Sequence, residues 1–201
     1  MFANDELHFV KQSQNGDLEA FNRLVVQYQS QAFGVAFSIS RDRAAAEDVV
    51  QESFISAYKN IKKFRGGNFK TWLLRIVTNA SIDHLRSSKR RPAESLEESM
   101  SSNPSFDIPS RAESPEDRVV RGELRTEIFK GLETLHYDQR TAVSLVDIQG
   151  MDYEEAADVM DVSLGTLKSR LSRGRFRLRD YLLKRPELLP SEFRLSSEAP
   201  K

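Results

Sequence analysis

Residues 152–171 read DYEEAADVMDVSLGTLKSRL, a pattern that predicts two helices joined by a tight turn. Asp152 with Glu155 three residues later is a capping-box pattern, which starts the first helix. The turn falls on residues 161–163, and the alanines at positions 156 and 157 let the helices cross closely. This arrangement is typical of a helix-turn-helix, whose second helix is suited to the DNA major groove.

The two helices differ in charge. Residues 152–161 carry five acidic side chains and no basic one, whereas residues 164–185 carry eight Lys or Arg and one Asp. At roughly 100° per residue, the second helix has an inward stripe made of Leu164, Leu167, Leu171, Leu178 and Leu182. Its outward face then consists of Gly165, Ser169, Ser172, Arg173 and Phe176, with Lys168 and Arg170 on the flanks.

We expect this outward face to bind DNA. The N-terminal part of a recognition helix meets base edges, so the candidates for base or adjacent phosphate contacts are Lys168, Ser169, Ser172 and Arg173. We expect mainly phosphate contacts from Arg175, Arg177 and Arg179. The alternative is a solvated basic helix in an ordinary helical bundle.

The composition is that of a globular protein with one ordinary domain or two small ones. The 201 residues are 39% hydrophobic and include 12 Phe, which is enough for helical cores. There is no apolar run of transmembrane length and no signal-peptide pattern, so we expect a cytoplasmic protein without membrane insertion. The absence of cysteine excludes disulfides and thiolate metal sites.

The net charge of zero conceals a segregation along the chain. Residues 1–91 hold 14 basic and 9 acidic side chains, whereas residues 92–117 hold 1 and 7. Residues 92–115 are rich in Ser, Pro and Glu and have few apolar side chains, which predicts a flexible acidic linker. We therefore expect an all-α protein with two small helical domains, residues 1–91 and 116–186, and a disordered tail over residues 187–201.

Three helices are expected in the first domain. Apolar residues at helical spacing run from Leu18 to Phe37, and a second helix begins after Asp42, a plausible N-cap. After a break at residues 66–68, a third helix covers about residues 70–90.

The second of these helices carries an acidic face. Asp48, Gln51, Glu52 and Ile55 lie together opposite the apolar stripe. An acidic face with an apolar centre suits docking against a basic protein surface, whereas its charge disfavours DNA contact. The residue types alone favour the alternative, a plain solvated face.

The third helix has the opposite charge. Its outward face contains Arg75, Asn79, Arg86 and Arg90. Around its start, over residues 62–72, cations alternate with aromatic rings about a Gly-Gly pair; the candidates there are Lys62, Phe64, Arg65, Asn68, Phe69 and Trp72. This combination is typical of single-stranded nucleic-acid binding. The cations contact the phosphate backbone, and the rings or a polar pocket hold the unstacked bases. The alternative is that the rings are core residues at the start of the helix.

The sequence contains no catalytic constellation. His8, His84 and His136 lie far apart without metal-ligand spacing, and His84 falls on the side of its helix expected to be packed. There is no phosphate-binding loop, nucleophile elbow or dinucleotide fingerprint. We therefore expect no enzymatic activity, no cofactor and no metal.

Five motifs in order resemble bacterial sigma factors of the extracytoplasmic-function type. They are AEDVVQESF (46–54), FRG with FKTWL (64–66 and 69–73), NASIDHLR (79–86), YEEAA (153–157) and GTLKSRL (165–171). The resemblance covers nearly all of residues 10–185. It implies that the two domains correspond to sigma regions 2 and 4.

The resemblance also implies partners and roles. Core RNA polymerase would be bound through its beta-prime clamp by Asp48, Gln51, Glu52 and Ile55, and through its beta flap. The minus 10 element of promoter DNA would be opened by Lys62, Phe64, Arg65, Asn68, Phe69, Trp72, Arg75, Asn79, Arg86 and Arg90. The minus 35 element would be read by Thr166, Lys168, Ser169, Arg170, Ser172, Arg173 and Arg175. An anti-sigma factor is a further expected partner.

Two other functions remain open on the residues alone. A two-domain helix-turn-helix regulator could act without stable polymerase association, but it gives no reason for the cations and rings over residues 62–72. An adaptor or anti-sigma-like protein could use the acidic face without DNA, but the basic face over residues 75–90 argues against it.

Overall fold

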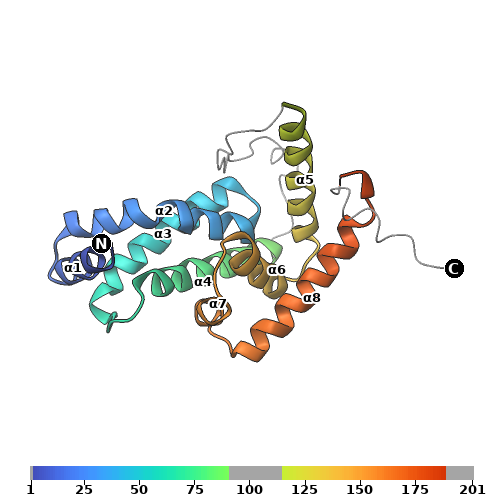
Figure 1. The fold of residues 1–201 in the computed structure, drawn as a ribbon. Helices are drawn as coiled ribbons and strands as arrows, with labels where there is room; N and C mark the ends of the chain where they lie inside the picture. The colour runs from blue at the N-terminus through green and yellow to red at the C-terminus, as the bar shows by residue number, and fades with distance from the viewer. Residues whose placement is uncertain (1, 91–114, 189–201) are drawn as a thin grey trace.

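The computed structural model describes residues 2–90 and 115–188, with side chains for residues 6–87 and 122–187. Within these ranges the fold is all-helical, as predicted (Figure 1). The N-terminal helices are α1 (Phe2–Gln14), α2 (Leu18–Ser40), α3 (Arg43–Asn60) and α4 (Phe69–Arg90). The C-terminal helices are α5 (Pro115–Glu133), α6 (Tyr137–Val143), α7 (Tyr153–Met160) and α8 (Leu164–Leu182).

Two of the expected boundaries fall at the edge of the described ranges. The linker expected over residues 92–115 lies outside them, apart from Pro115, where α5 begins. Glu187 and Leu188, the first two residues of the predicted tail, belong to a 3₁₀ turn, Pro186–Leu188. The rest of that tail lies outside the described residues.

Helices α2 and α3 begin at aspartate caps. Asp17 Oδ1 accepts a hydrogen bond from Ala20 N at 3.1 Å, and Asp42 Oδ1 accepts one from Ala45 N at 2.8 Å. A side-chain acceptor at this position satisfies an amide that has no partner within the helix. Helices α2, α3 and α4 then bury a common core that includes Leu24, Val35, Ala57, Leu73, Leu74 and Val77.

The helix-turn-helix forms as the sequence predicts. Asp152 Oδ1 accepts from Glu155 N at 2.7 Å and starts α7, and Ser163 Oγ accepts from Thr166 N at 3.2 Å and starts α8. Between them, Asp161 takes a left-handed conformation with φ of 54°, which Asp tolerates better than most residues. Leu167 and Leu171 on α8 are fully buried.

Helices α6 and α8 approach each other closely at Gly174. A Cβ atom on this residue would lie 2.8 Å from Val143 Cγ2 and 3.1 Å from Gln139 O. Both distances are shorter than ordinary van der Waals contact, so the packing of α8 on α6 requires glycine at this position.

The two groups of helices pack against each other, which the sequence did not predict. Helix α7 packs across α4, and α6 lies near the C-terminal end of α2 (Figure 1). His84, which we expected to be packed, is exposed on α4. None of the described helices is long and apolar enough to cross a membrane.

We predict that Gly174→Ala lowers the free energy of unfolding by about 1–3 kcal/mol, because the added methyl overpacks the contact between α6 and α8. Urea unfolding followed by circular dichroism measures the change. Gly165→Ala on the same helix is the matched control, because Gly165 is exposed and the helical propensity of alanine favours it there. Equal effects of the two substitutions would contradict the packing.

Candidate nucleic-acid interface

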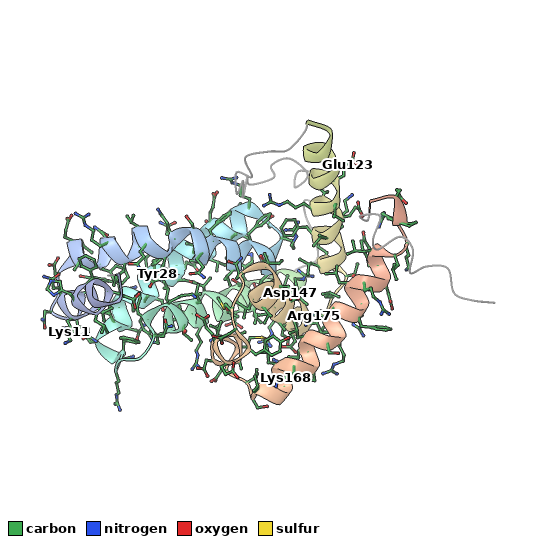
Figure 2. All side chains as sticks on the ribbon, viewed as in Figure 1. Lys11, Tyr28, Glu123, Asp147, Lys168 and Arg175 are labelled. Carbon is green, nitrogen blue, oxygen red and sulfur yellow. The ribbon has the colours of Figure 1, made fainter. Side chains whose placement is uncertain are left out.

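The outward face of α8 has the composition expected for contact with a duplex. Lys168, Ser169, Ser172 and Arg173 are all exposed on it. Figure 2 shows Lys168 near the start of α8, projecting away from the other helices. Thr166 is half-buried, and its Oγ1 lies 2.9 Å from Ser163 Oγ at the cap, so this hydroxyl is engaged at the start of the helix.

Arg173 is held in position by the preceding turn of α8. Its Nε donates to Ser169 O at 3.1 Å, and its Nη2 donates to Ser169 Oγ at 3.2 Å. These bonds restrict the rotamers of a long side chain and leave Nη1 for an outside acceptor. A guanidinium held in this way loses less conformational entropy when it binds a base edge or a phosphate.

Arg170 and Arg175 are turned toward acidic side chains of their own module. Arg170 Nη1 lies 3.3 Å from Asp138 Oδ1. Arg175 donates to both carboxylate oxygens of Asp147, at 3.0 and 2.6 Å, and to the hydroxyl of Tyr153 at 3.3 Å. Figure 2 shows Asp147 and Arg175 close together between the π-helical segment Ser144–Ile148 and α8.

The contact with Asp147 raises the pKa of the Arg175 guanidinium above its ordinary value. In this conformation Arg170 and Arg175 brace α8 against its own domain. The nearby carboxylates partly neutralise both guanidiniums, which weakens the attraction of either one for DNA. Of the residues expected at the duplex, the outward group is therefore Lys168, Ser169, Ser172 and Arg173.

The last cations of α8 also have partners. Arg177 Nη1 donates to Gln139 Oε1 at 3.2 Å. The Arg179 guanidinium lies 4.8 Å from the centre of the exposed Phe176 ring and 3.3 Å from Asp180. These arginines remain exposed, which suits phosphate contacts better than reading of bases.

The residues on the basic face of α4 differ in their exposure to solvent. Asn79 is exposed, and Arg86 is exposed with Asp83 3.5 Å away. Arg75 is partly covered because α7 lies against it. Arg90 is the last residue of α4, and its side chain lies outside the described set.

The loop before α4 separates its cations from its rings. Lys62, Arg65 and Asn68 are exposed, and Asn68 Oδ1 accepts from Thr71 N at 3.1 Å as a cap of α4. Phe64 and Phe69 are only 7% and 1% exposed, and their rings pack edge to face with centres 5.8 Å apart. These two rings are core residues, as the alternative interpretation allowed, so neither stacks on a base in this conformation.

Trp72 is half-buried beside these rings, 5.3 Å from the centre of Phe64. The sequence analysis missed Gln14, whose Nε2 donates to Ile61 O at 3.1 Å and to Phe64 O at 2.8 Å. Gln14 thereby ties the end of α1 to the loop that presents Lys62 and Arg65. Nothing in the local pattern of residues 10–18 indicates a contact with a loop so far along the chain.

The acidic face of α3 is exposed to solvent. Asp48, Gln51 and Glu52 are exposed, and Ile55 is 48% exposed among them. An apolar side chain surrounded by acids is a suitable centre for a protein contact. Within the described residues, no group of His, Asp and Glu is arranged to hold a metal ion.

Two sequence families match the chain in the order of its two helical groups. Sigma-70 region 2 matches residues 24–91, and Sigma-70, region 4 matches residues 125–178. The first match covers most of α2 through α4, and the second covers most of α5 through α8.

Curated proteins and solved structures agree with these families. The chain is 38% identical to RNA polymerase sigma-H factor of Pseudomonas aeruginosa over 173 residues, 83% of this chain and 88% of that protein. It is 37% identical to ECF RNA polymerase sigma-E factor of Haemophilus influenzae over 177 residues, 83% of this chain and 89% of that protein. Among solved structures, it is similar to the sigma factor RpoE in complex with the anti-sigma factor NepR from Bartonella quintana, with 27% identity, a TM-score of 0.63 and coverage of 82% of this chain and 98% of that one.

We predict that Phe64→Ala lowers the free energy of unfolding by about 3–5 kcal/mol, because it leaves a cavity where a buried ring packs. Chemical denaturation measures the loss. The neighbouring Arg65→Ala removes an exposed side chain and is expected to change stability by no more than about 0.5 kcal/mol. A Phe64→Ala protein as stable as the Arg65→Ala protein would show that the ring is free in solution.

Proposed function

The chain belongs to the extracytoplasmic-function type of RNA polymerase sigma factor, and from this membership we propose which of its surfaces bind polymerase and which bind the promoter. Proteins of this family direct RNA polymerase to promoters, so the chain is a transcription initiation factor and not an enzyme. The proposal divides the chain into residues 1–91, which bind core polymerase and open the minus 10 element, and residues 116–186, which read the minus 35 element.

The duplex reader in this proposal is the outward face of α8. Lys168, Ser169, Ser172 and Arg173 would contact base edges and the adjacent phosphates, because α8 is the second helix of the helix-turn-helix. Thr166 would contribute through the N-terminus of the helix. Asp138 and Asp147 partly neutralise Arg170 and Arg175, so their contribution to phosphate binding would be smaller than that of Arg173.

The strand-opening surface in this proposal is α4 with the loop before it. Asn79 has both hydrogen-bond donors and an acceptor, which an extruded base requires, and it lies between Arg75 and Arg86 on the outward face. Lys62, Arg65 and Arg90 would add phosphate contacts, and the half-buried Trp72 would flank the captured strand. Phe64 and Phe69 would act indirectly, by holding the loop in place.

Promoter opening requires contacts between the protein and the promoter that form only when the DNA strand is unpaired. Extrusion of one base costs a few kcal/mol, so capture of that base and of the strand phosphates must offset the cost. The exposed position of Asn79 among cations supports this role for α4.

The acidic face of α3 is the proposed docking surface for polymerase. Asp48, Gln51, Glu52 and Ile55 would contact the beta-prime clamp, and the C-terminal module would contact the beta flap. The exposure of Ile55 within this acidic face supports the assignment. Since the polymerase and the promoter are in the cytoplasm, we place the chain there.

A protein inhibitor is a further expected partner. The Bartonella quintana sigma factor is described in complex with an anti-sigma factor. By analogy we propose that an anti-sigma factor binds this chain and competes with polymerase.

The observation that carries the proposal is the pair of cationic faces on two different helical groups, α4 and α8, together with an acidic face on α3. A regulator that binds DNA alone needs the α8 face only. A sigma factor needs all three.

We predict that Asn79→Ala and Arg173→Ala impair different steps of initiation. Asn79→Ala should reduce promoter opening by core polymerase about tenfold or more, because one base loses its pocket. Arg173→Ala should weaken binding of the upstream duplex about tenfold, the equivalent of one contact worth about 1–3 kcal/mol. Permanganate reactivity of the unpaired strand measures the first effect, and footprinting of the upstream element measures the second.

The matched control is Lys11→Ala, which removes one exposed cation from α1, in the other helical group from Lys168 (Figure 2). It should change neither readout. Equal loss of opening and upstream binding in both test variants would refute the division between α4 and α8.

A further inference from the structure

The loop between α3 and α4 joins a conformationally free segment to two fixed ends. Gly66 and Gly67 are exposed and have positive φ angles of 100° and 95°, a region that glycine adopts readily. At its ends the loop is held by Phe64 and Phe69, whose buried rings pack edge to face. The position of the exposed Arg65 therefore depends on how firmly the ends of the loop are held.

Gln14, the last residue of α1, holds the first end of this loop. Its Nε2 donates hydrogen bonds to Ile61 O at 3.1 Å and to Phe64 O at 2.8 Å. Ile61 O also accepts from Phe64 N at 3.0 Å, so the amide of Gln14 bridges the first and last carbonyls of one 3₁₀ turn. Through one side chain, α1 fixes the turn that carries the exposed Lys62.

Helix α1 is itself fixed on the N-terminal helices, so it can support the loop. Val10 in the middle of α1 is buried, and the hydroxyl of Tyr28 on α2 donates to the carboxylate of Glu6. The centre of the Tyr28 ring lies 5.9 Å from that of Phe69. The loop thus has a direct support at one end, through Gln14, and a support at the other end from a residue that α1 also contacts.

The cations on this loop are available to an outside anion. Lys62 and Arg65 are exposed, and within the described residues neither has an acidic partner. A cation that is already in position loses less conformational entropy when it binds a phosphate. A loop with two adjacent glycines has much backbone freedom to lose, so a hydrogen-bonded support matters more here than in a stiffer segment.

We propose that Gln14 is a positioning residue for promoter opening, whose amide holds the loop so that Lys62 and Arg65 meet the unpaired minus 10 strand. Gln14 acts through the main chain of the loop and touches no DNA itself. The inference rests on the proposed role of α4 and its preceding loop in opening.

The test removes the amide and keeps the size and charge of the side chain. Gln14→Met has an unbranched side chain of similar length, but it cannot donate a hydrogen bond. Gln12→Met is the matched control, because it makes the same change on the same helix. The side-chain amide of Gln12 has no hydrogen-bond partner within the described part of the chain. Circular dichroism establishes that each variant is folded under the conditions of the assays.

In the free chain, the loop is monitored by Trp72, the single tryptophan of the 201 residues. Its half-buried ring lies 5.3 Å from that of Phe64, whose carbonyl Gln14 holds. Release of the loop exposes this ring, so Gln14→Met should shift the emission of Trp72 to longer wavelength and increase its quenching by acrylamide. Gln12→Met should match the unaltered chain. Unchanged emission and quenching in Gln14→Met would show that the amide does not hold the loop.

With core polymerase, permanganate reactivity of the minus 10 strand measures opening, and footprinting measures binding of the upstream duplex. Gln14→Met should reduce opening about three- to tenfold, because the loop must then be ordered at the moment of binding. It should leave the upstream footprint unchanged, since the proposed reader of that duplex is α8. A residue that only supports the fold would lower both readouts together.

Several results would overturn the positioning role: full opening by Gln14→Met, equal loss of opening and upstream binding, equal loss in Gln12→Met, or a Gln14→Met chain that does not fold. Asn79→Ala distinguishes this failure from failure of the proposed function. If Asn79→Ala impairs opening and Gln14→Met does not, only the positioning role fails. If neither impairs opening, the proposed role of α4 fails, and the positioning role fails with it.

Discussion

Helices α4 and α8 each bury one apolar stripe and carry their cations on the opposite side. On α4 the buried residues are Leu73, Leu74 and Val77, and on α8 they are Leu167 and Leu171. Because an amphipathic helix is oriented by the burial of its apolar side, the polar residues at intermediate positions have a fixed direction. This one-sided burial turns Asn79 on α4 and Lys168 on α8 toward solvent. The proposed strand-opening face of α4 and the proposed duplex-reading face of α8 both depend on it.

Much of the fold follows from patterns that act within one or two helical turns. The caps at Asp42 and Asp152 and the outward direction of Ser169 and Arg173 depend on spacing alone, and the structure agrees with them. Aromatic rings at the start of a helix occur both in protein cores and on binding surfaces, so the sequence could not decide where Phe64 and Phe69 lie. The structure places both rings in the core. The contact between Arg140 and Ile39 joins residues more than a hundred positions apart, so no local pattern indicates it.

The same separation in sequence explains why the pairing of the modules was not foreseen. Charge counts identify α7 as acidic and α4 as basic, but both are also complementary to other partners: polymerase for acids, DNA for cations. In the structure, Lys70 and Arg75 have the acids of α7 as partners.

The central claim is that these surfaces work together only on polymerase. Run-off transcription with purified core enzyme and a library of genomic fragments measures this most directly. The account predicts discrete transcripts from a subset of fragments when the full-length chain is added, and none from core enzyme alone. It also predicts that the chain without core enzyme leaves no footprint on the fragments that are transcribed. Absence of chain-dependent transcripts, or an equal footprint with and without core enzyme, would contradict the account.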